Sequence, residues 1–112
     1  MKKLEIIIRP EKLEDLKRIL DESNANGLMI TNIMGYGKQK GHKQIYRGTE
    51  FTVNLLPKIK VESIVSTEVA QVVVDKVLSR INTGNYGDGK IFIYDVDDVV
   101  RIRTGERGHD AL

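Results

Sequence analysis

The strongest constraint on the fold is an order of elements that occurs twice: an apolar strand pattern, a helical pattern and a second strand pattern. In the first copy, the apolar run 4–9 stops at Pro10, which typically ends a strand. Apolar residues then recur at helical spacing from Glu11, and this pattern predicts an amphipathic helix that frays before Gly27. A second strand is predicted over 28–34.

The second copy begins with an alternating strand pattern over 58–65. The valines that follow favour strands, but their helical stripe and the length of the segment favour a helix over 67–81 with Ser66 as its N-cap. A last strand is predicted over 91–96. Two such units within 112 residues predict a single domain, spanning 1–112, with the α+β ferredoxin-like order βαββαβ.

That order gives an antiparallel four-stranded sheet with two helices on one face. The predicted strands are apolar on both sides, and one layer of helices covers only one of them. We therefore expect a homo-oligomer that buries the uncovered face. A core packed around a ligand cavity is the alternative.

Composition excludes several classes of protein. The formal net charge of +2 is too small to indicate a nucleic-acid or membrane-surface partner. The chain has no cysteine, which excludes disulfides and thiolate metal sites. We find no apolar stretch near the ~20 residues of a membrane span and no signal peptide, and we expect a soluble cytosolic protein.

Three glycines and a lysine mark the segment 83–90, which reads Thr-Gly-Asn-Tyr-Gly-Asp-Gly-Lys. Such a backbone can point consecutive N–H groups at an anion, and Lys90 adds a positive charge. The spacing fits a P-loop, but Ile91 stands where that motif needs Ser or Thr, and the segment opens a strand instead of a helix. The segment indicates phosphate binding without a P-loop; a glycine-rich hairpin turn is the equal alternative.

A long glycine-containing segment, 35–54, separates the second and third predicted strands. Loops of this length are usually functional or disordered. It is basic and carries Tyr46 and Phe51 near its tip, which is typical of a partner-binding arm. A β-hairpin is the less favoured alternative, because 44–46 and 51–53 alternate weakly.

Two arginines near the C-terminal end form a second cationic feature. Arg101 and Arg103 are expected on the same side of an extended segment, 99–104, where both guanidinium groups can contact phosphate oxygens. The alternative is a pair of solvated edge charges. The glycine–lysine segment upstream favours phosphate binding.

Taken together, these residues closely resemble the PII nitrogen-regulatory signal proteins over the whole chain. The resemblance is carried by separate motifs in the order of that family: Arg9-Pro10, Gly35-Tyr36-Gly37-Lys38-Gln39-Lys40-Gly41, Tyr46-Arg47-Gly48-Thr49-Glu50-Phe51, Leu56-Pro57-Lys58, Thr83-Gly84, Gly87-Asp88-Gly89-Lys90-Ile91-Phe92 and Arg101-Ile102-Arg103-Thr104-Gly105-Glu106.

The resemblance implies a homotrimer with nucleotide sites in the clefts between neighbours. ATP and ADP would compete there, and 2-oxoglutarate would bind alongside MgATP. The long loop, called the T-loop in that family, would bind or release targets such as ammonium transporters and nitrogen-metabolism enzymes. The resemblance also implies a regulator with at most slow ATP hydrolysis, in the cytoplasm or at the membrane through a transporter partner.

The resemblance assigns roles to particular positions. The implied nucleotide site comprises Met29, Gly35, Gly37, Lys38, Gln39, Glu62, Ile64, Gly87, Asp88, Gly89, Lys90, Arg101 and Arg103. Gln39 and Lys58 would bind 2-oxoglutarate, and Gln39 would also complete the Mg²⁺ site. The implied partner-binding loop includes Lys40, His42, Tyr46, Arg47, Gly48, Thr49, Glu50 and Phe51.

Four positions depart from patterns that are frequent in the family. Phe51 replaces the tyrosine that many members modify by uridylylation, so no modification is expected there. Thr49 replaces a serine that is phosphorylated in cyanobacterial members. Lys38 replaces an arginine and exchanges a bidentate fork for a point charge, which would weaken discrimination for ATP. Met29 replaces a threonine, so an apolar contact with the adenine is expected.

Other functions fit the residues less well. An RNA-binding RRM domain needs stacking aromatics on its central strands, and 58–65 has none. An enzyme needs a positioned histidine, cysteine or carboxylate pair, whereas His42 and His109 are isolated. In the segment 83–90, Asp88 is expected to shape its own loop and not to act as a base. A nucleotide-free effector-binding module of ACT type is the remaining alternative; Lys90 and the arginine pair disfavour it.

Overall fold

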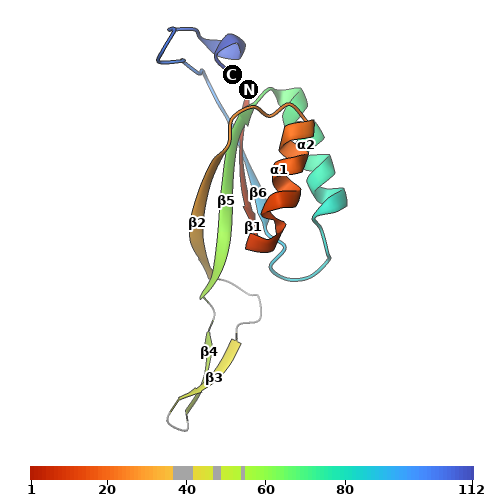
Figure 1. Cartoon of the computed structure of the whole chain (residues 1–112), viewed down its shortest axis with the longest axis vertical. Helices are drawn as coiled ribbons and strands as arrows, with labels where there is room; N and C mark the ends of the chain where they lie inside the picture. Colours follow the sequence, from red (N-terminus) through yellow and green to blue (C-terminus); the bar gives the residue numbers. More distant parts are fainter. Residues whose placement is uncertain (37–41, 47–48, 54) are drawn as a thin grey trace.

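The computed structural model describes residues 1–36, 42–46, 49–53 and 55–112, with the backbone alone for the two short segments in the middle. Four strands form one antiparallel sheet in the order β2-β5-β1-β6, and both helices cover the same face (Figure 1). The predicted ferredoxin-like fold is confirmed. The elements of this layer are β1 (Lys2–Ile8), α1 (Leu13–Glu22), β2 (Met29–Tyr36), β5 (Leu55–Val65), α2 (Thr67–Arg80) and β6 (Lys90–Asp95).

The core lies between the sheet and the helices. Alternate residues of β1 point toward the helices, so Leu4, Ile6 and Ile8 are buried while their neighbours face the other side. The apolar stripe of α1 packs against them through Leu16, Ile19 and Leu20; Val61 of β5 and Val73 and Val77 of α2 complete this layer. Each fully buried aliphatic side chain contributes about 1.5–3 kcal/mol relative to exposure.

Helix boundaries follow local capping. Ser66 is the N-cap of α2, as predicted, and its Oγ accepts a hydrogen bond from the N–H of Val69 at 3.2 Å. The end of α1 differs from the prediction: the helix stops at Glu22, and Asn24, not Gly27, takes the left-handed conformation with φ 62°. Asparagine adopts that conformation more readily than other residues with a side chain. A short 3₁₀ turn, η1 (Pro10–Lys12), precedes α1.

The long segment between β2 and β5 contains a second, two-stranded sheet. Strands β3 (His42–Tyr46) and β4 (Thr49–Val53) pair antiparallel, beyond the end of the main sheet in Figure 1. The weak alternation over 44–46 and 51–53 therefore predicted a real hairpin in this segment. Strand pairing does not test the expectation that the segment binds a partner, which stays a prediction. The flanking strands are also longer than predicted, since β2 extends to Tyr36 and β5 begins at Leu55.

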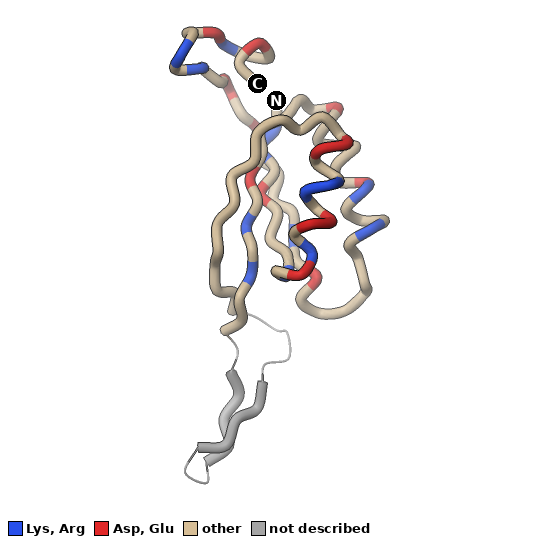
Figure 2. The backbone as a smooth tube through the Cα atoms, in the orientation of Figure 1, with Lys and Arg blue, Asp and Glu red and all other residues tan. Residues whose placement is uncertain are grey.

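The uncovered face of the sheet carries charged side chains at its centre, beside exposed apolar side chains such as Met29 and Phe92. Lys3 Nζ lies 2.7 Å from Glu62 Oε2, and the hydroxyl of Tyr94 donates to Glu5 Oε2 at 2.8 Å. Lys60 lies 3.8 Å from both Glu5 and Glu62. The hydrogen bond from Lys3 lowers the pKa of Glu62. Figure 2 marks charged positions along β5.

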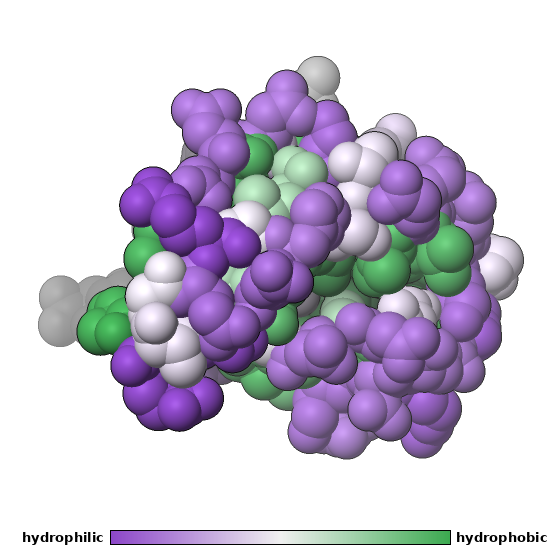
Figure 3. All heavy atoms as spheres, turned by 90° about the horizontal axis from the view of Figure 1, so that it is seen from above, coloured by the Kyte–Doolittle hydropathy of each residue, from purple (hydrophilic) through white to green (hydrophobic). Residues whose placement is uncertain are grey.

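The two ends of the main sheet carry different segments of the chain. The loop 82–89 joins α2 to β6 at the end nearest the hairpin, whereas the segment after β6 lies at the opposite end, next to the N-terminus (Figure 1). Seen from that opposite end, most of the surface is hydrophilic, with apolar patches between the polar side chains (Figure 3). Neither helix in the described part of the chain is long and apolar enough to span a bilayer.

Candidate functional site

One carboxylate closes the loop 82–89 on itself. Asp88 accepts hydrogen bonds from the backbone N–H of Thr83 at 2.7 Å, from Thr83 Oγ1 at 2.5 Å and from the N–H of Gly84 at 3.0 Å. The hydrogen bonds from Thr83 hold the pKa of Asp88 below its ordinary value. The carboxylate therefore shapes the loop. Its oxygens face the backbone of their own loop, as expected for a residue that shapes the loop.

The loop approaches β1 so closely that one position requires glycine. Gly89 has φ 112°, and a Cβ at this position would lie 1.7 Å from the carbonyl oxygen of Ile7. Gly87 also has a positive φ, 92°. These two glycines let the chain turn tightly from the loop into β6, where Lys90 pairs with Ile7 of β1. The turn leaves a backbone surface without side chains, which an anion can approach.

Two cations converge on the carbonyl oxygen of Gly87. Lys58 Nζ donates to it at 2.9 Å and Arg9 Nε at 3.1 Å, and Arg9 also donates to the carbonyl of Tyr86. A second guanidinium nitrogen of Arg9 lies 3.9 Å from Asp88. Lys58 is only 6% exposed, and burial and then the charge of Arg9 lower its pKa. This end of the sheet thus holds two positive charges close together.

Gly35 makes room for this arrangement. A Cβ at Gly35 would lie 2.9 Å from Lys58 Cγ, so the lysine stem lies against the backbone of β2. Gly35, Lys58 and the loop glycines are therefore brought together, as the resemblance implies. Arg9 belongs to the same group, although neither its sequence context nor the resemblance gave it a role. The only sequence feature that could have pointed to Arg9 is its position directly before Pro10, where β1 has ended and the chain turns.

A second group of expected site residues lies toward the other end of the uncovered face. Met29 pairs in register with Glu62 across β2 and β5, and its side chain is 53% exposed. Ile64 follows on the same face of β5. Glu62 is held by Lys3, so a ligand that hydrogen-bonds to this carboxylate meets an already paired group.

The two arginines do not lie on an extended segment, and that prediction is wrong. Residues 102–104 form a turn, in which the N–H of Gly105 donates to the carbonyl of Arg101 at 2.7 Å. Arg101 is tied to Glu106 twice, through its N–H at 2.9 Å and through its guanidinium at 2.8 Å. Gly105 permits this turn because it has φ 74°.

Lys90 and the arginines lie at opposite ends of β6. Strand β6 runs from Lys90 to Asp95, a span of about 17 Å at the usual rise per residue. Arg101 and Arg103 lie further along the chain, in the segment beyond the opposite end of the sheet (Figure 1). One copy of the chain therefore cannot place Lys90 and these arginines on the same phosphate group.

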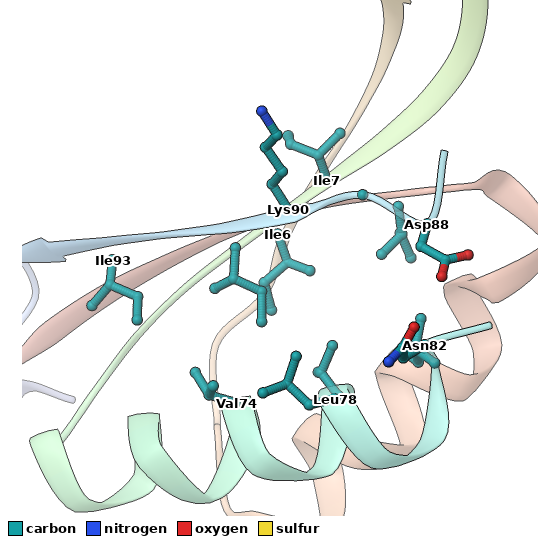
Figure 4. Close-up of a pocket in the computed structure, with 13 residues that line it drawn as sticks. Ile6, Ile7, Val74, Leu78, Asn82, Asp88, Lys90 and Ile93 are labelled. Atoms are coloured by element: carbon teal, nitrogen blue, oxygen red, sulfur yellow. The ribbon is translucent and has the colours of Figure 1, made fainter. Parts of the chain in front are cut away.

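An apolar cavity of about 420 Å³ lies between α2 and the edge strand β6. Val74 and Leu78 of α2 and Ile93 of β6 point into it, and Asn82 and Asp88 lie at one end (Figure 4). The side chain of Lys90 points away from the cavity, toward the uncovered face. The cavity and the uncovered face thus lie on opposite sides of the same edge strand.

Several expected site residues lie outside the described residues: Gly37, Lys38, Gln39, Lys40, Arg47 and Gly48. His42, Tyr46, Thr49, Glu50 and Phe51 belong to the hairpin, where only the backbone is described. Within the described residues, no three His, Cys, Asp or Glu side chains gather as a metal site. The expected Mg²⁺ ligand, Gln39, is not among them.

Comparisons with known proteins agree with the resemblance. Residues 1–106 match the model of the family described as nitrogen regulatory protein P-II. The chain is 47% identical to nitrogen regulatory protein P-II of Rhizobium meliloti (strain 1021) and 46% identical to that of Pasteurella multocida (strain Pm70). It is 45% identical to nitrogen regulatory protein P-II 1 of Escherichia coli (strain K12). Each alignment covers 112 residues and all of both chains.

Proposed function

Since the chain belongs to the nitrogen regulatory protein P-II family, we propose that it is a homotrimeric signal protein that senses ATP or ADP together with 2-oxoglutarate. Through the segment 35–54 it controls target proteins such as an ammonium transporter or nitrogen-metabolism enzymes. It acts as a regulator with at most slow ATP hydrolysis, in the cytoplasm or at the membrane through a transporter partner.

The observation that carries this proposal is the pair of cations at Gly87. Glu11 and Asp88 favour the charged form of Lys58, yet burial and Arg9 outweigh them and lower its pKa. A bound carboxylate would relieve this imbalance because it offers Lys58 and Arg9 a charged acceptor in place of a backbone carbonyl. A small dicarboxylic acid such as 2-oxoglutarate has the required charge, and Gln39 with Mg²⁺ would hold its other end.

The nucleotide fits the division of the remaining residues into two groups. The phosphates would meet Lys90 and the backbone of Gly87 and Gly89 from one copy. Arg101 and Arg103 would come from its neighbour, with Met29, Glu62 and Ile64 close to the base. This division supports sites between copies, because each copy offers the phosphate loop at one end and the arginines at the other.

Calorimetric titration of MgATP, with and without 2-oxoglutarate, tests the proposal. We expect MgATP to bind alone and 2-oxoglutarate to bind only when MgATP is present. Lys58→Met should abolish the response to 2-oxoglutarate and leave MgATP binding intact. Its free energy of unfolding should stay unchanged or rise by about 1 kcal/mol, because a buried charge is replaced by an apolar chain of similar length. Lys17→Met, on the exposed side of α1, is the matched control.

Mixed trimers test whether the site lies between copies. Lys90→Ala and Arg103→Ala should each weaken ATP binding at least tenfold without unfolding the protein. Trimers that contain both variants include sites where an intact Lys90 faces an intact Arg103, so they should recover part of the tight binding. Absence of recovery would contradict the shared site. Normal ATP binding by both separate variants would contradict the phosphate assignment itself.

A further inference from the structure

The guanidinium group of Arg101 is occupied by acceptors of its own chain. Its Nη1 donates to Glu106 Oε1 at 2.8 Å, and its Nη2 donates to the carbonyl oxygen of Leu112 at 3.2 Å. Arg103, two positions further on, is exposed and makes no ion pair or side-chain hydrogen bond with any described residue. The two arginines that the resemblance treats alike therefore differ, since only Arg101 is engaged within the chain.

Glu106 is kept beside Arg101 by the backbone of the turn. The N–H of Arg101 donates to the carbonyl of Glu106 at 2.9 Å, and Val100 bridges to Arg107. Because residues 101 and 106 face each other across this turn, their side chains lose little conformational entropy when they pair. The pair is partly exposed, with side-chain exposures of 35% for Arg101 and 44% for Glu106. The carboxylate is therefore a fixed neighbour of the guanidinium.

The second acceptor of Arg101 is held by packing. The 3₁₀ turn η2 (Gly108–Ala111) leads to Leu112, which is half-buried. Leu112 lines a pocket of about 210 Å³ together with Val65 and Val69, where β5 passes into α2. This packing gives the carbonyl of Leu112 a defined place next to Arg101.

A phosphate group needs the donors that these acceptors use. Arginine binds phosphate most strongly as a fork, in which two N–H groups donate to two oxygens. In Arg101 both terminal nitrogens donate to Glu106 or Leu112, and the negative charge of Glu106 repels an approaching phosphate. A phosphate that takes both nitrogens must displace these acceptors, whereas it can engage Arg103 without such an exchange.

We propose that Glu106, together with the carbonyl of Leu112, is an internal competitor that weakens nucleotide binding by occupying Arg101. The inference rests on the proposed function, because it requires Arg101 to bind phosphate when the nucleotide is present. The competitor raises the nucleotide concentration at which the site fills. It also couples the conformation of the segment 98–108 to the occupancy of the site, because Glu106 is released when phosphate takes its place.

Removing only the charge of the competitor tests the proposal. Glu106→Gln keeps the shape of the side chain and one acceptor oxygen, and the backbone hydrogen bonds of the turn do not depend on this side chain. Because a partly exposed ion pair contributes up to about 1 kcal/mol, MgATP should bind about two- to fivefold more tightly, measured by calorimetry in 0.15 M salt. The matched control is Asp110→Asn, which removes one negative charge from the same segment and should leave the affinity unchanged. Asp110 forms no ion pair with any described residue.

Double variants identify the group for which Glu106 competes. In an Arg103→Ala background, Glu106→Gln should still tighten MgATP binding by the same factor, because Arg101 is intact. In an Arg101→Ala background, Glu106→Gln should have no effect, because the competition has lost its target.

Weaker or unchanged MgATP binding by Glu106→Gln would overturn the proposal; weaker binding would mean that the carboxylate holds Arg101 in place for the phosphate. Equal tightening in Asp110→Asn, or tightening that persists in the Arg101→Ala background, would overturn it as well, since either result reduces the effect to net charge. Failure of the proposed function looks different. In that case the natural protein does not bind MgATP, or Arg101→Ala binds it as tightly as the natural protein does.

Discussion

Two loops of this protein are each organised by one aspartate, but they are attached to the sheet very differently. In the loop 82–89, Asp88 accepts hydrogen bonds from Thr83 and Gly84. In the segment 98–108, Asp98 accepts hydrogen bonds from the N–H groups of Val99 and Gly108, at 2.8 and 3.1 Å, and from the side chain of Arg107 at 2.9 Å. Both carboxylates are held by local backbone, and neither is aimed at a ligand.

The difference lies in what surrounds each aspartate. The loop 82–89 is fixed to the sheet by the buried Lys58, by Arg9 and by the close approach of Gly89 to β1. The segment 98–108 relies on exposed contacts; the side chain of Arg107, for example, is 68% exposed. Similar local hydrogen bonding thus occurs in one loop that is fixed to the buried sheet and in one that is held through exposed contacts. We expect the first to bind phosphate with little rearrangement and the second to move toward a neighbour.

A methyl group at each loop's glycine should give the largest contrast. Gly89→Ala would place a Cβ 1.7 Å from the Ile7 carbonyl oxygen, so either β1 or the loop must move. We expect a loss of more than about 3 kcal/mol in the free energy of unfolding. Gly105→Ala meets no atom within 4 Å and carries only the cost of its φ of 74°, about 1–2 kcal/mol. Denaturant unfolding of both variants at one protein concentration measures the difference, and equal losses would refute it.

Removing the charge of each aspartate should affect the protein less than the glycine variants do, and the effect should appear in MgATP binding and in the pH dependence of unfolding. Asp88→Asn should weaken MgATP binding several-fold because the loop loses acceptors for Thr83, whereas Asp98→Asn should weaken it less.

Thr83 lowers the pKa of Asp88, so the stabilisation of the folded protein by this carboxylate is complete above about pH 4 and is lost as the pH falls through the lowered pKa. Unfolding measured between pH 2 and 6 should show this loss in the natural protein and a weaker one in Asp88→Asn. Equal pH profiles would contradict the assigned role.

Arg107→Ala should change the stability of the protein least. This change removes an exposed ion pair with Asp98, and exposed ion pairs contribute little to stability. The melting temperature should stay within about 2 °C of the natural protein. A larger decrease, measured by thermal unfolding in 0.15 M salt, would mean that the segment 98–108 is held as firmly as the loop 82–89.

Local periodicity predicted the parts of the fold that depend on neighbouring residues. The strand that ends before Pro10 and the capping of α2 by Ser66 are decided within a few positions, and both predictions were correct. The end of α1 was placed at Gly27 because glycine is the usual residue there, but Asn24 takes the left-handed position first. The ion pair between Lys3 and Glu62 on the uncovered face could not be predicted, because it depends on the pairing of β1 with β5.

The site was predicted less completely than the fold. The loop was identified from its glycines and Lys90, and Lys58 through the resemblance; the structure brings Lys58 and Gly87 together. Arg9 was missed because its contact with Gly87 joins residues 78 positions apart, which no local pattern reveals. The turn at Arg101 was taken for a strand, since alternation over a few residues cannot exclude a turn that depends on Glu106 and Gly105.

The absence of a side chain at Gly35 gives the protein a short route for passing information. The stem of Lys58 occupies the space that a Cβ at Gly35 would fill, and Gly35 is the last residue but one of β2 before the segment that leads to the hairpin. If Lys58 moves toward a bound anion, the backbone of β2 at Gly35, directly before the segment that leads to the hairpin, would therefore move as well. Binding of an anion at Lys58 could thus change the position of the hairpin through one van der Waals contact, without any rotation of domains.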